Sequence, residues 1–132
     1  MKILFLCVAN SARSQMAEGL ARRELGEIAE VVSAGSSPSK VNPLAIEVLA
    51  EIGVDIKSHK SKSIDNIDLK YVDLIVTLCA EEVCPIVPGK IKKFHWPFPD
   101  PAVPGTVDAQ RKAFTTVRDG ILVKIRELRR TL

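Results

Sequence analysis

Cys7 is the residue whose setting in this sequence most clearly allows chemistry. It ends a short apolar run, and Arg13 follows six positions later, where a helix-like pattern begins. A cysteine there could fill the core, form half of a disulfide, bind a metal or act as a nucleophile. The loop between the two residues is long enough for its backbone N–H groups to converge. With a helix N-terminus and the bidentate guanidinium of Arg13, such a loop binds a tetrahedral oxyanion.

The same positive field stabilises a thiolate, so we expect a lowered pKa for Cys7 and in-line attack by its sulfur. Ser14 can donate its hydroxyl to that sulfur, while Asn10 and Ser11 hold the loop. The plainer interpretation is a buried structural cysteine followed by a helix N-cap serine, but the position between a strand and a helix favours a nucleophile. The predicted oxyanion-binding residues are Val8, Ala9, Asn10, Ser11, Ala12, Arg13 and Ser14.

Two more cysteines and one aspartate complete the candidate catalytic set. Cys79 ends a second apolar run, and Cys84 follows on a polar stretch, "LCAEEVCP". Taken singly, Cys79 could be core filling and Cys84 a semi-exposed spectator, but beside Cys7 they favour redox chemistry. Asp100 in "PFPDPA" is held between prolines and could act as a general acid or start a turn before Pro101. Because no C-x2-C or Cys/His spacing is present, we predict no metal and no cofactor.

Apolar runs alternate with helical periodicity along the chain, and these elements must position the candidate residues. The expected strands span residues 2–6, 29–35, 72–79 and 90–96, and the expected helices run from 14 to near 26, from 42 to 53 and from 108 to 130. This alternation predicts an α/β fold with a parallel sheet and right-handed crossovers. Ligands of such sheets bind beyond the carboxyl ends of the strands, where both Cys7 and Cys79 lie.

Helical periodicity also predicts which side chains each helix buries. The predicted buried sets are Met16, Ala17, Leu20, Ala21 and Leu25; Leu44, Ile46, Val48, Leu49 and Ile52; and Phe114, Val117, Ile121, Ile125 and Leu128. Asn42 and Pro43 are expected to start the second helix as N-cap and first residue, and Gly53 to end it. Residues 54–66 are expected to be irregular, and the proline-rich stretch 97–105 to form a fixed loop.

Composition sets the broad class of the protein. A length of 132 residues suits one domain, and 46% hydrophobic residues with 27% charged ones are ordinary for a globular protein. A net charge of +3 with only 5% aromatic residues argues against nucleic acid. No apolar run is long enough to cross a bilayer, and the start "MKILFLCVAN" lacks the features of a signal peptide. We therefore predict a cytoplasmic monomer without membrane contact. The odd number of cysteines indicates that they take part in a reaction rather than form structural disulfides.

The segment "CVANSARSQMAEG", residues 7–19, resembles the phosphate-binding loop of the low-molecular-weight tyrosine phosphatase superfamily, and most of all its arsenate reductase branch. The resemblance continues through 32–35, 42–49, 73–79, 84–102 and the final helix, so that it covers nearly the whole chain. It implies one low-molecular-weight phosphatase-like domain over residues 1–132, built on a four-stranded parallel sheet flanked by helices.

The resemblance also implies a relay of three cysteines. Cys7 attacks arsenate to form a thiol–arsenate adduct, and Cys79 then attacks the sulfur of Cys7, which releases arsenite. Cys84 next attacks Cys79, which frees Cys7 and leaves a Cys79–Cys84 disulfide for thioredoxin to reduce. Glutaredoxin or another thiol remains an alternative donor. The four-residue gap between Cys79 and Cys84 is shorter than in the thioredoxin-coupled members.

Other functions share this loop. A phosphotyrosine or phosphomonoester phosphatase would use Cys7, Arg13 and Asp100, but the phosphatases commonly carry a tyrosine where this sequence has Ala102. That difference favours a small inorganic oxyanion such as arsenate, which phosphate or sulfate can mimic. A phosphocarrier would have no use for a hydrolytic acid at position 100.

A cation site is a smaller open question. Asn10, Glu18 and Ser33 match positions of a potassium site in some reductases, and Lys62 stands where the remaining carboxylate would be. Either the Lys62 ammonium takes the place of the cation or the site is absent, and we predict no bound potassium. The two histidines, His59 and His95, are interpreted as structural or surface residues.

Overall fold

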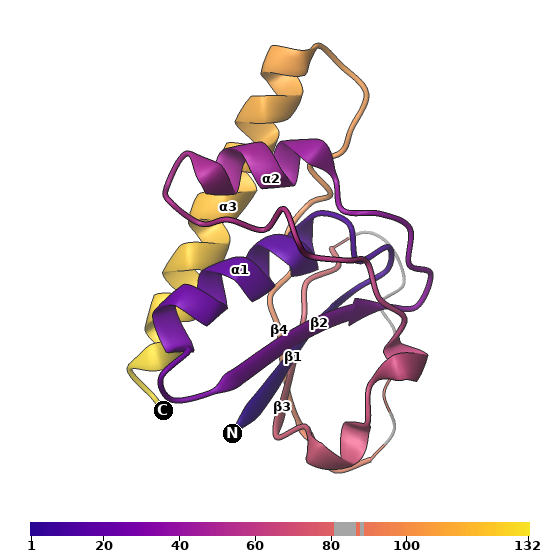
Figure 1. The fold of residues 1–132 in the computed structure, drawn as a ribbon, viewed down its shortest axis with the longest axis vertical. Coiled ribbons are helices and arrows are strands. Elements are labelled where there is room, and N and C mark those ends of the chain that lie inside the picture. The colour runs from indigo at the N-terminus through magenta and orange to yellow at the C-terminus, as the bar shows by residue number, and fades with distance from the viewer. Residues whose placement is uncertain (81–86, 88) are drawn as a thin grey trace.

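The chain folds around a four-stranded sheet in which every pair of neighbouring strands is parallel (Figure 1). The computed structural model describes residues 1–80, 87 and 89–132. In chain order the elements are β1 (Lys2–Cys7), α1 (Arg13–Leu25), β2 (Glu30–Gly35), α2 (Pro43–Ala50), two 3-10 turns (Ile64–Asn66 and Leu69–Tyr71), β3 (Leu74–Thr77), β4 (Lys92–His95) and α3 (Val107–Arg129). The predicted four-stranded parallel α/β fold is confirmed.

Strand β1 lies inside the sheet, whose order is β2-β1-β3-β4. Its last residue, Cys7, is paired with Gly35 at the end of β2, and Leu6 is paired with Thr77 at the end of β3. The carboxyl ends of these three strands therefore meet at one edge, which is the edge where parallel sheets bind ligands. Strand β3 is shorter than the predicted 72–79, so Cys79 lies two residues beyond its end.

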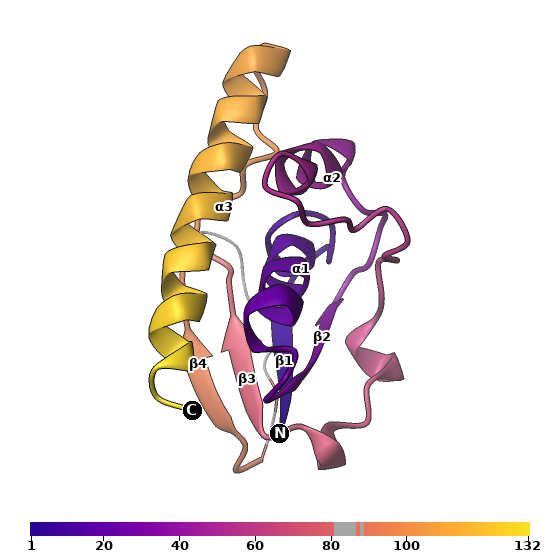
Figure 2. The same ribbon diagram turned by 60° about the vertical axis from the view of Figure 1, so that its left-hand side comes forward.

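The two faces of the sheet are covered in different ways. Side chains alternate along β1, so that Ile3 and Phe5 point to the side of α1, α2 and α3, while Leu4 and Leu6 point to the other. Figure 2 shows the three helices together on one side of the strands, with the segment that contains the 3-10 turns set apart from them. Ile64, the first residue of the first 3-10 turn, packs against the apolar cluster on this other face of the sheet, which contains Leu4 and Leu6.

The helices begin and end close to the predicted positions for local reasons. The side chain of Asn42 accepts a hydrogen bond from Leu44 N at 2.9 Å, Pro43 is the first helical residue of α2, and Gly53 follows the helix with φ +80°. Helix α3 is capped by Thr106, whose Oγ1 accepts from Ala109 N at 3.1 Å. The sequence predicts the signals at Asn42, Pro43 and Gly53, whereas Thr106 lies two residues before the predicted start of the last helix.

The predicted buried sets of α1 and α3 are confirmed, because all ten side chains lie in the helix-side core. In α2 only part of the prediction is right: Val48 and Leu49 are buried, but Leu44, Ile46 and Ile52 are half-buried, and Ala45 is buried instead. Helix α2 packs against α1 and α3, and only Ala45, Val48 and Leu49 of this helix are buried, so it buries a narrower face than predicted. Within the described residues, none of the helices has the length and apolarity that a bilayer crossing requires.

Candidate active site

Cys7 lies where the sequence places it, at the carboxyl end of the inner strand β1, and its thiol is free and buried. Its sulfur is 2.8 Å from Ser14 Oγ. Ser14 is inside α1, whose N-cap residue is Ala12, so the interpretation of Ser14 as a helix N-cap is wrong. The N-cap residue Ala12 makes no side-chain capping hydrogen bond to this helix, and a helix N-terminus favours an anion at the loop that precedes it.

The loop of residues 8–12 is held from outside by the segment that follows β2. Three of its carbonyl groups accept hydrogen bonds there: Val8 O from Ser37 N (2.9 Å), Ala9 O from Ser39 N (3.1 Å) and Ser11 O from Asn42 N (2.9 Å). In a trans peptide unit the next N–H points to the side opposite the carbonyl. The N–H groups after these carbonyls therefore point away from the supporting segment, as an anion-binding loop requires.

Asn10 fixes the shape of this loop from within. Its backbone is in the left-handed region with φ +47°, and it is fully buried. Its Nδ2 donates to Ser14 Oγ at 2.7 Å and to Ser33 Oγ at 3.0 Å, while its Oδ1 accepts from Lys62 N at 2.7 Å. Asn10 is thus bonded to α1, β2 and the segment before β3, which supports its predicted role of holding the loop.

Gly35, the last residue of β2, allows the loop to approach the sheet. A Cβ at this position would lie 2.3 Å from Val8 O and 2.9 Å from Asn10 N. Since both neighbours are backbone atoms of the loop, no side-chain rearrangement could relieve the overlap. The glycine of "VSAG" is therefore required by this close approach.

A small cavity of about 140 Å³ opens at the end of the loop. Its lining residues are Cys7, Ala9, Ser11, Ala12, Arg13, Ser39, Asp100 and Ala102. Pockets that bind organic ligands usually measure about 300 Å³ or more, so this cavity suits a single tetrahedral oxyanion. The structure thus brings Cys7, Arg13 and Asp100 together, and it adds Ser39, a residue that no sequence pattern singles out.

The loop of residues 97–102 brings Asp100 to the cavity. The buried guanidinium of Arg13 donates from its NH1 to Phe98 O at 3.0 Å, which ties this loop to the start of α1. Asp100 Oδ1 accepts from Ala102 N at 2.9 Å, so the aspartate also starts a turn, while the residue as a whole is exposed. Both interpretations of Asp100, a turn former and a cavity residue, therefore fit the structure together.

Cys79 is buried, with 1% of its surface exposed. Leu78 N donates to Leu6 O at 2.9 Å, so the chain before Cys79 runs beside the end of β1, next to Cys7. Cys84 lies outside the described residues. The relay between the cysteines therefore stays a prediction.

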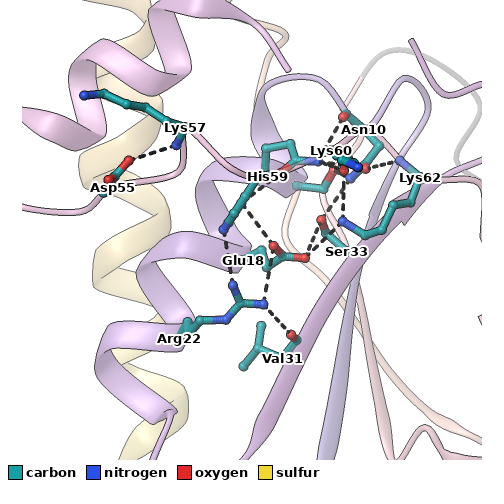
Figure 3. Close-up of polar contacts among 12 residues, drawn as sticks. Asn10, Glu18, Arg22, Val31, Ser33, Asp55, Lys57, His59, Lys60 and Lys62 are labelled. Carbon is teal, nitrogen blue, oxygen red and sulfur yellow. Dashed lines mark hydrogen bonds and ion pairs between the residues drawn. The ribbon is translucent and has the colours of Figure 1, made fainter. Parts of the chain in front are cut away.

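A cluster of charged side chains lies behind the loop, around the buried carboxylate of Glu18 (Figure 3). Ser33 Oγ donates to Glu18 Oε1 at 3.0 Å, and Lys62 Nζ lies 3.4 Å from the same oxygen. Glu18 Oε2 faces His59 Nδ1 at 3.1 Å and Arg22 NH2 at 3.5 Å. Of the two alternatives for Lys62, an ammonium beside the Glu18 carboxylate is the one that the structure fits.

His59 is buried in this cluster, with 8% of its side chain exposed. Burial away from water lowers the pKa of His59, and the positive charges of Arg22 and Lys62 add to this effect, while Glu18 opposes it. Neutral imidazole is therefore favoured. Among residues 1–80, 87 and 89–132, no three His, Cys, Asp or Glu side chains gather closely enough to hold a metal ion.

The comparison with known proteins agrees with this geometry. The family model of low molecular weight phosphotyrosine protein phosphatases matches residues 2–132. The chain is 49% identical over 127 residues to arsenate reductase 2 of Staphylococcus saprophyticus, covering 95% of this chain and 93% of that protein. It is 43% identical over 132 residues to the arsenate reductase of Bacillus subtilis, covering 98% and 95%.

Solved structures give the same relationship. An arsenate reductase in the phosphate binding state superposes with a TM-score of 0.80 and 32% identity, covering 96% of this chain and 95% of that one. The thioredoxin-dependent arsenate reductase of Corynebacterium glutamicum gives 0.76 and 31%, covering 98% of this chain and 60% of that one. The present chain belongs to the low molecular weight phosphotyrosine protein phosphatase family.

Proposed function

We propose that this protein is an arsenate reductase that attacks arsenate with Cys7. The observation that carries the proposal is the free Cys7 thiol in a cavity of about 140 Å³ lined also by Arg13 and Asp100, with the Ser14 hydroxyl 2.8 Å from its sulfur. Relatives that share 43% to 49% of their residues with this chain are named arsenate reductases, which supports the same activity here.

In the first step the Cys7 thiolate attacks arsenic, an S–As bond forms, and one arsenate oxygen leaves as water. Arg13 and the backbone N–H groups of residues 8–14 stabilise the oxyanion and the charge that develops on it. Asp100 donates the proton that the departing oxygen needs. The Ser14 hydroxyl stabilises the sulfur as a thiolate before the attack.

The second step supplies two electrons. The Cys79 thiolate attacks the sulfur of Cys7, the S–As bond breaks, and its electron pair stays on arsenic. Arsenic is thereby reduced from As(V) to As(III) and leaves as arsenite, while the two sulfurs are oxidised to a Cys7–Cys79 disulfide. The burial of Cys79 near the end of β1 supports this role.

The third step regenerates the nucleophile. Cys84 attacks Cys79, Cys7 leaves as a thiolate, and a Cys79–Cys84 disulfide forms. Thioredoxin then reduces this disulfide by giving up two electrons from its own dithiol. Similarity to a thioredoxin-dependent reductase supports this donor, and glutaredoxin or a small thiol is the alternative that the experiment below separates.

A second activity, hydrolysis of phosphomonoesters, shares the first step. Asp100 lines the cavity together with Cys7 and Arg13, which is the set that a phosphatase of this family would use. The size of the cavity and the methyl group of Ala102 at its wall favour a small inorganic ion over an aromatic ester. We therefore expect phosphatase activity to be the minor one.

The test is arsenate-dependent oxidation of NADPH in the presence of thioredoxin and thioredoxin reductase, with glutaredoxin and glutathione as the parallel arm. Wild type should turn over repeatedly with thioredoxin, whereas Cys79→Ser and Cys84→Ser should not. Multiple turnover by both variants would refute the relay. Brisk hydrolysis of an aryl phosphate without arsenate reduction would replace the proposal with the phosphatase.

A further inference from the structure

Gln15, the third residue of α1, lies directly behind the oxyanion loop and is fully buried. Its Nε2 lies 2.9 Å from Asn10 Oδ1, 3.3 Å from Asn10 O and 2.9 Å from Lys60 O. All three partners are carbonyl oxygens, which only accept hydrogen bonds. The amide of Gln15 can therefore have only one orientation, with its nitrogen toward Asn10 and its oxygen, Oε1, turned the other way.

That oxygen faces the ring of His59, at 3.1 Å from Nδ1. The same ring nitrogen lies 3.1 Å from Glu18 Oε2. Since both oxygens accept, Nδ1 must carry a proton. On the opposite side of the ring, Nε2 lies 3.2 Å from Arg22 NH1, and a guanidinium only donates, so Nε2 must be unprotonated (Figure 3). His59 is thus held as the neutral Nδ1–H tautomer by contacts on both sides.

Arg22 is itself fixed by two acceptors. Its NH2 donates to Val31 O of β2 at 3.2 Å and lies 3.5 Å from Glu18 Oε2. The guanidinium therefore cannot turn its NH1 away from His59 without leaving these partners. The charged groups around the ring are Glu18 and Arg22 from α1 and Asp55 and Lys62 from the segment after α2.

The direction of donation continues from Gln15 toward the sulfur. Gln15 Nε2 and Lys62 N both donate to Asn10 Oδ1, which leaves the Nδ2 of Asn10 to donate to Ser14 Oγ at 2.7 Å. Because Ser14 Oγ accepts there, its own hydrogen is available to Cys7 Sγ at 2.8 Å. A reversed Gln15 amide would put an NH2 group against the proton of His59 and an oxygen against Asn10 Oδ1, and would break this order.

We propose that Gln15 and Arg22 are positioning residues of the active site. Arg22 keeps Nε2 of His59 unprotonated, His59 donates from Nδ1 to Gln15 Oε1 and reinforces the amide orientation that Asn10 and Lys60 set, and Gln15 holds Asn10 so that Ser14 donates to Cys7. The assignment rests on the proposed function, in which Cys7 reacts as a thiolate. Neither Gln15 nor Arg22 lines the cavity, so both act through other residues.

The first test uses ¹⁵N NMR of the histidine rings in the wild-type chain. Because the chain has two histidines, the His95→Asn variant identifies the signals of His59. At neutral pH the His59 ring should show a protonated Nδ1 and an unprotonated Nε2. Arg22→Met should keep the proton on Nδ1 but let Nε2 take up a second proton at a higher pH than in the wild type, because Nε2 loses its donor and the ring loses a neighbouring positive charge. Arg22→Lys, which keeps a positively charged donor, should behave like the wild type. An Nε2–H tautomer or an imidazolium in the wild type would overturn the proposal without any variant.

The second test measures how fast Cys7 is alkylated at neutral pH, in a chain whose other cysteines, Cys79 and Cys84, are replaced by serine. Gln15→Met and Arg22→Met should each slow alkylation about tenfold, the scale on which groups that orient a reacting residue act. Arg23→Met is the matched control, because Arg23 donates to Ile52 O and does not touch the cluster. Its rate should equal that of the parent.

The outcomes separate the two proposals. If Cys7 of the parent reacts no faster than an ordinary cysteine, the proposed nucleophile fails. If the parent reacts fast and folded Gln15→Met and Arg22→Met react equally fast, the positioning role fails while the nucleophile stands. Circular dichroism tests whether each variant is folded. Where a variant is not folded, the wild-type NMR result alone tests the positioning role.

Discussion

The sulfur of Cys7 and the hydroxyl of Ser14 lie 2.8 Å apart, although the first residue ends a strand and the second lies in the first turn of a helix. The loop between them is what brings the two together. Because Ser14 Oγ already accepts from Asn10, the hydrogen of the hydroxyl is directed to the sulfur. The strand, the loop and the helix therefore act as one unit around the thiol.

Replacing Ser14 by alanine should slow the attack of Cys7 on arsenate by about tenfold to a hundredfold, because the thiolate loses a hydrogen bond in a buried place. Rapid-quench measurement of the first turnover gives this rate. Ser58→Ala, at an exposed position, should leave the rate unchanged. An unaltered rate in Ser14→Ala would show that the short contact has no part in the reaction.

Replacing Gly35 by alanine should disturb the loop, since the new Cβ meets the backbone of Val8 at 2.3 Å. We expect a loss of about 1–3 kcal/mol in the free energy of unfolding and a marked loss of affinity for phosphate as an arsenate mimic. Urea unfolding and calorimetric phosphate binding measure the two effects. Ser36→Ala, one residue further on and exposed, serves as the control. Unchanged phosphate affinity in Gly35→Ala would contradict the close-approach argument.

The two roles of Asp100 can be separated by asparagine. Asp100→Asn keeps an oxygen that can accept from Ala102 N, so the turn and the stability should be retained. It cannot supply a proton, so kcat should fall by about 10² to 10⁴ while KM changes little. Asp108→Asn, at an exposed position of α3, is the comparison. Full activity in Asp100→Asn would leave the residue only its turn-forming role.

Stability should depend on pH through His59, whose pKa is lowered in the folded state from its ordinary value of 6.5, mainly by burial. Below that value the unfolded chain binds a proton on this residue more readily than the folded one does, so stability falls as the pH drops from about 6.5 toward the lowered pKa. Urea unfolding at a series of pH values measures the slope. His59→Asn should flatten it in this window, and His95→Asn should not.

A cavity in the apolar core between the sheet and the three helices should lower the stability of the protein strongly. Phe114 of α3 is fully buried in this core, and Phe114→Ala should lower the free energy of unfolding by about 3–5 kcal/mol. Val123 lies on the exposed side of the same helix, and Val123→Ala should stay within about 0.5 kcal/mol of the wild type. Similar losses in both variants would mean that the core has been assigned to the wrong face.

Much of the site could be predicted because its parts are close together in the sequence. Cys7, the loop and Arg13 form one continuous segment between a strand and a helix, and periodicity alone located the buried stripes of α1 and α3. Asp100 could be predicted from the family resemblance, which implies a general acid at this position of "PFPDPA". These signals are local, and the rules for parallel sheets then bring the strand ends together.

The support behind the loop could not be predicted, because it depends on contacts between distant parts of the chain. His59 lies in the irregular segment after α2, 44 residues from Gln15, and no periodic pattern fixes where its ring points. Ser39 reaches the cavity through an equally irregular stretch. Helix propensities also do not indicate that all three helices pack on one face of the sheet. Nor do they indicate that the segment with the two 3-10 turns packs on the other face.

The central claim is that Cys7 attacks arsenate and that Cys79 and Cys84 then carry the oxidation away. A single turnover of the reduced protein with arsenate, without any donor, tests it most directly when arsenite is counted and the disulfides are mapped by mass spectrometry. Wild type should release one arsenite per chain and end with free Cys7 and a Cys79–Cys84 disulfide, whereas Cys84→Ser should stop at a Cys7–Cys79 disulfide. Arsenite release by Cys7→Ser, or none by the wild type, would contradict the account.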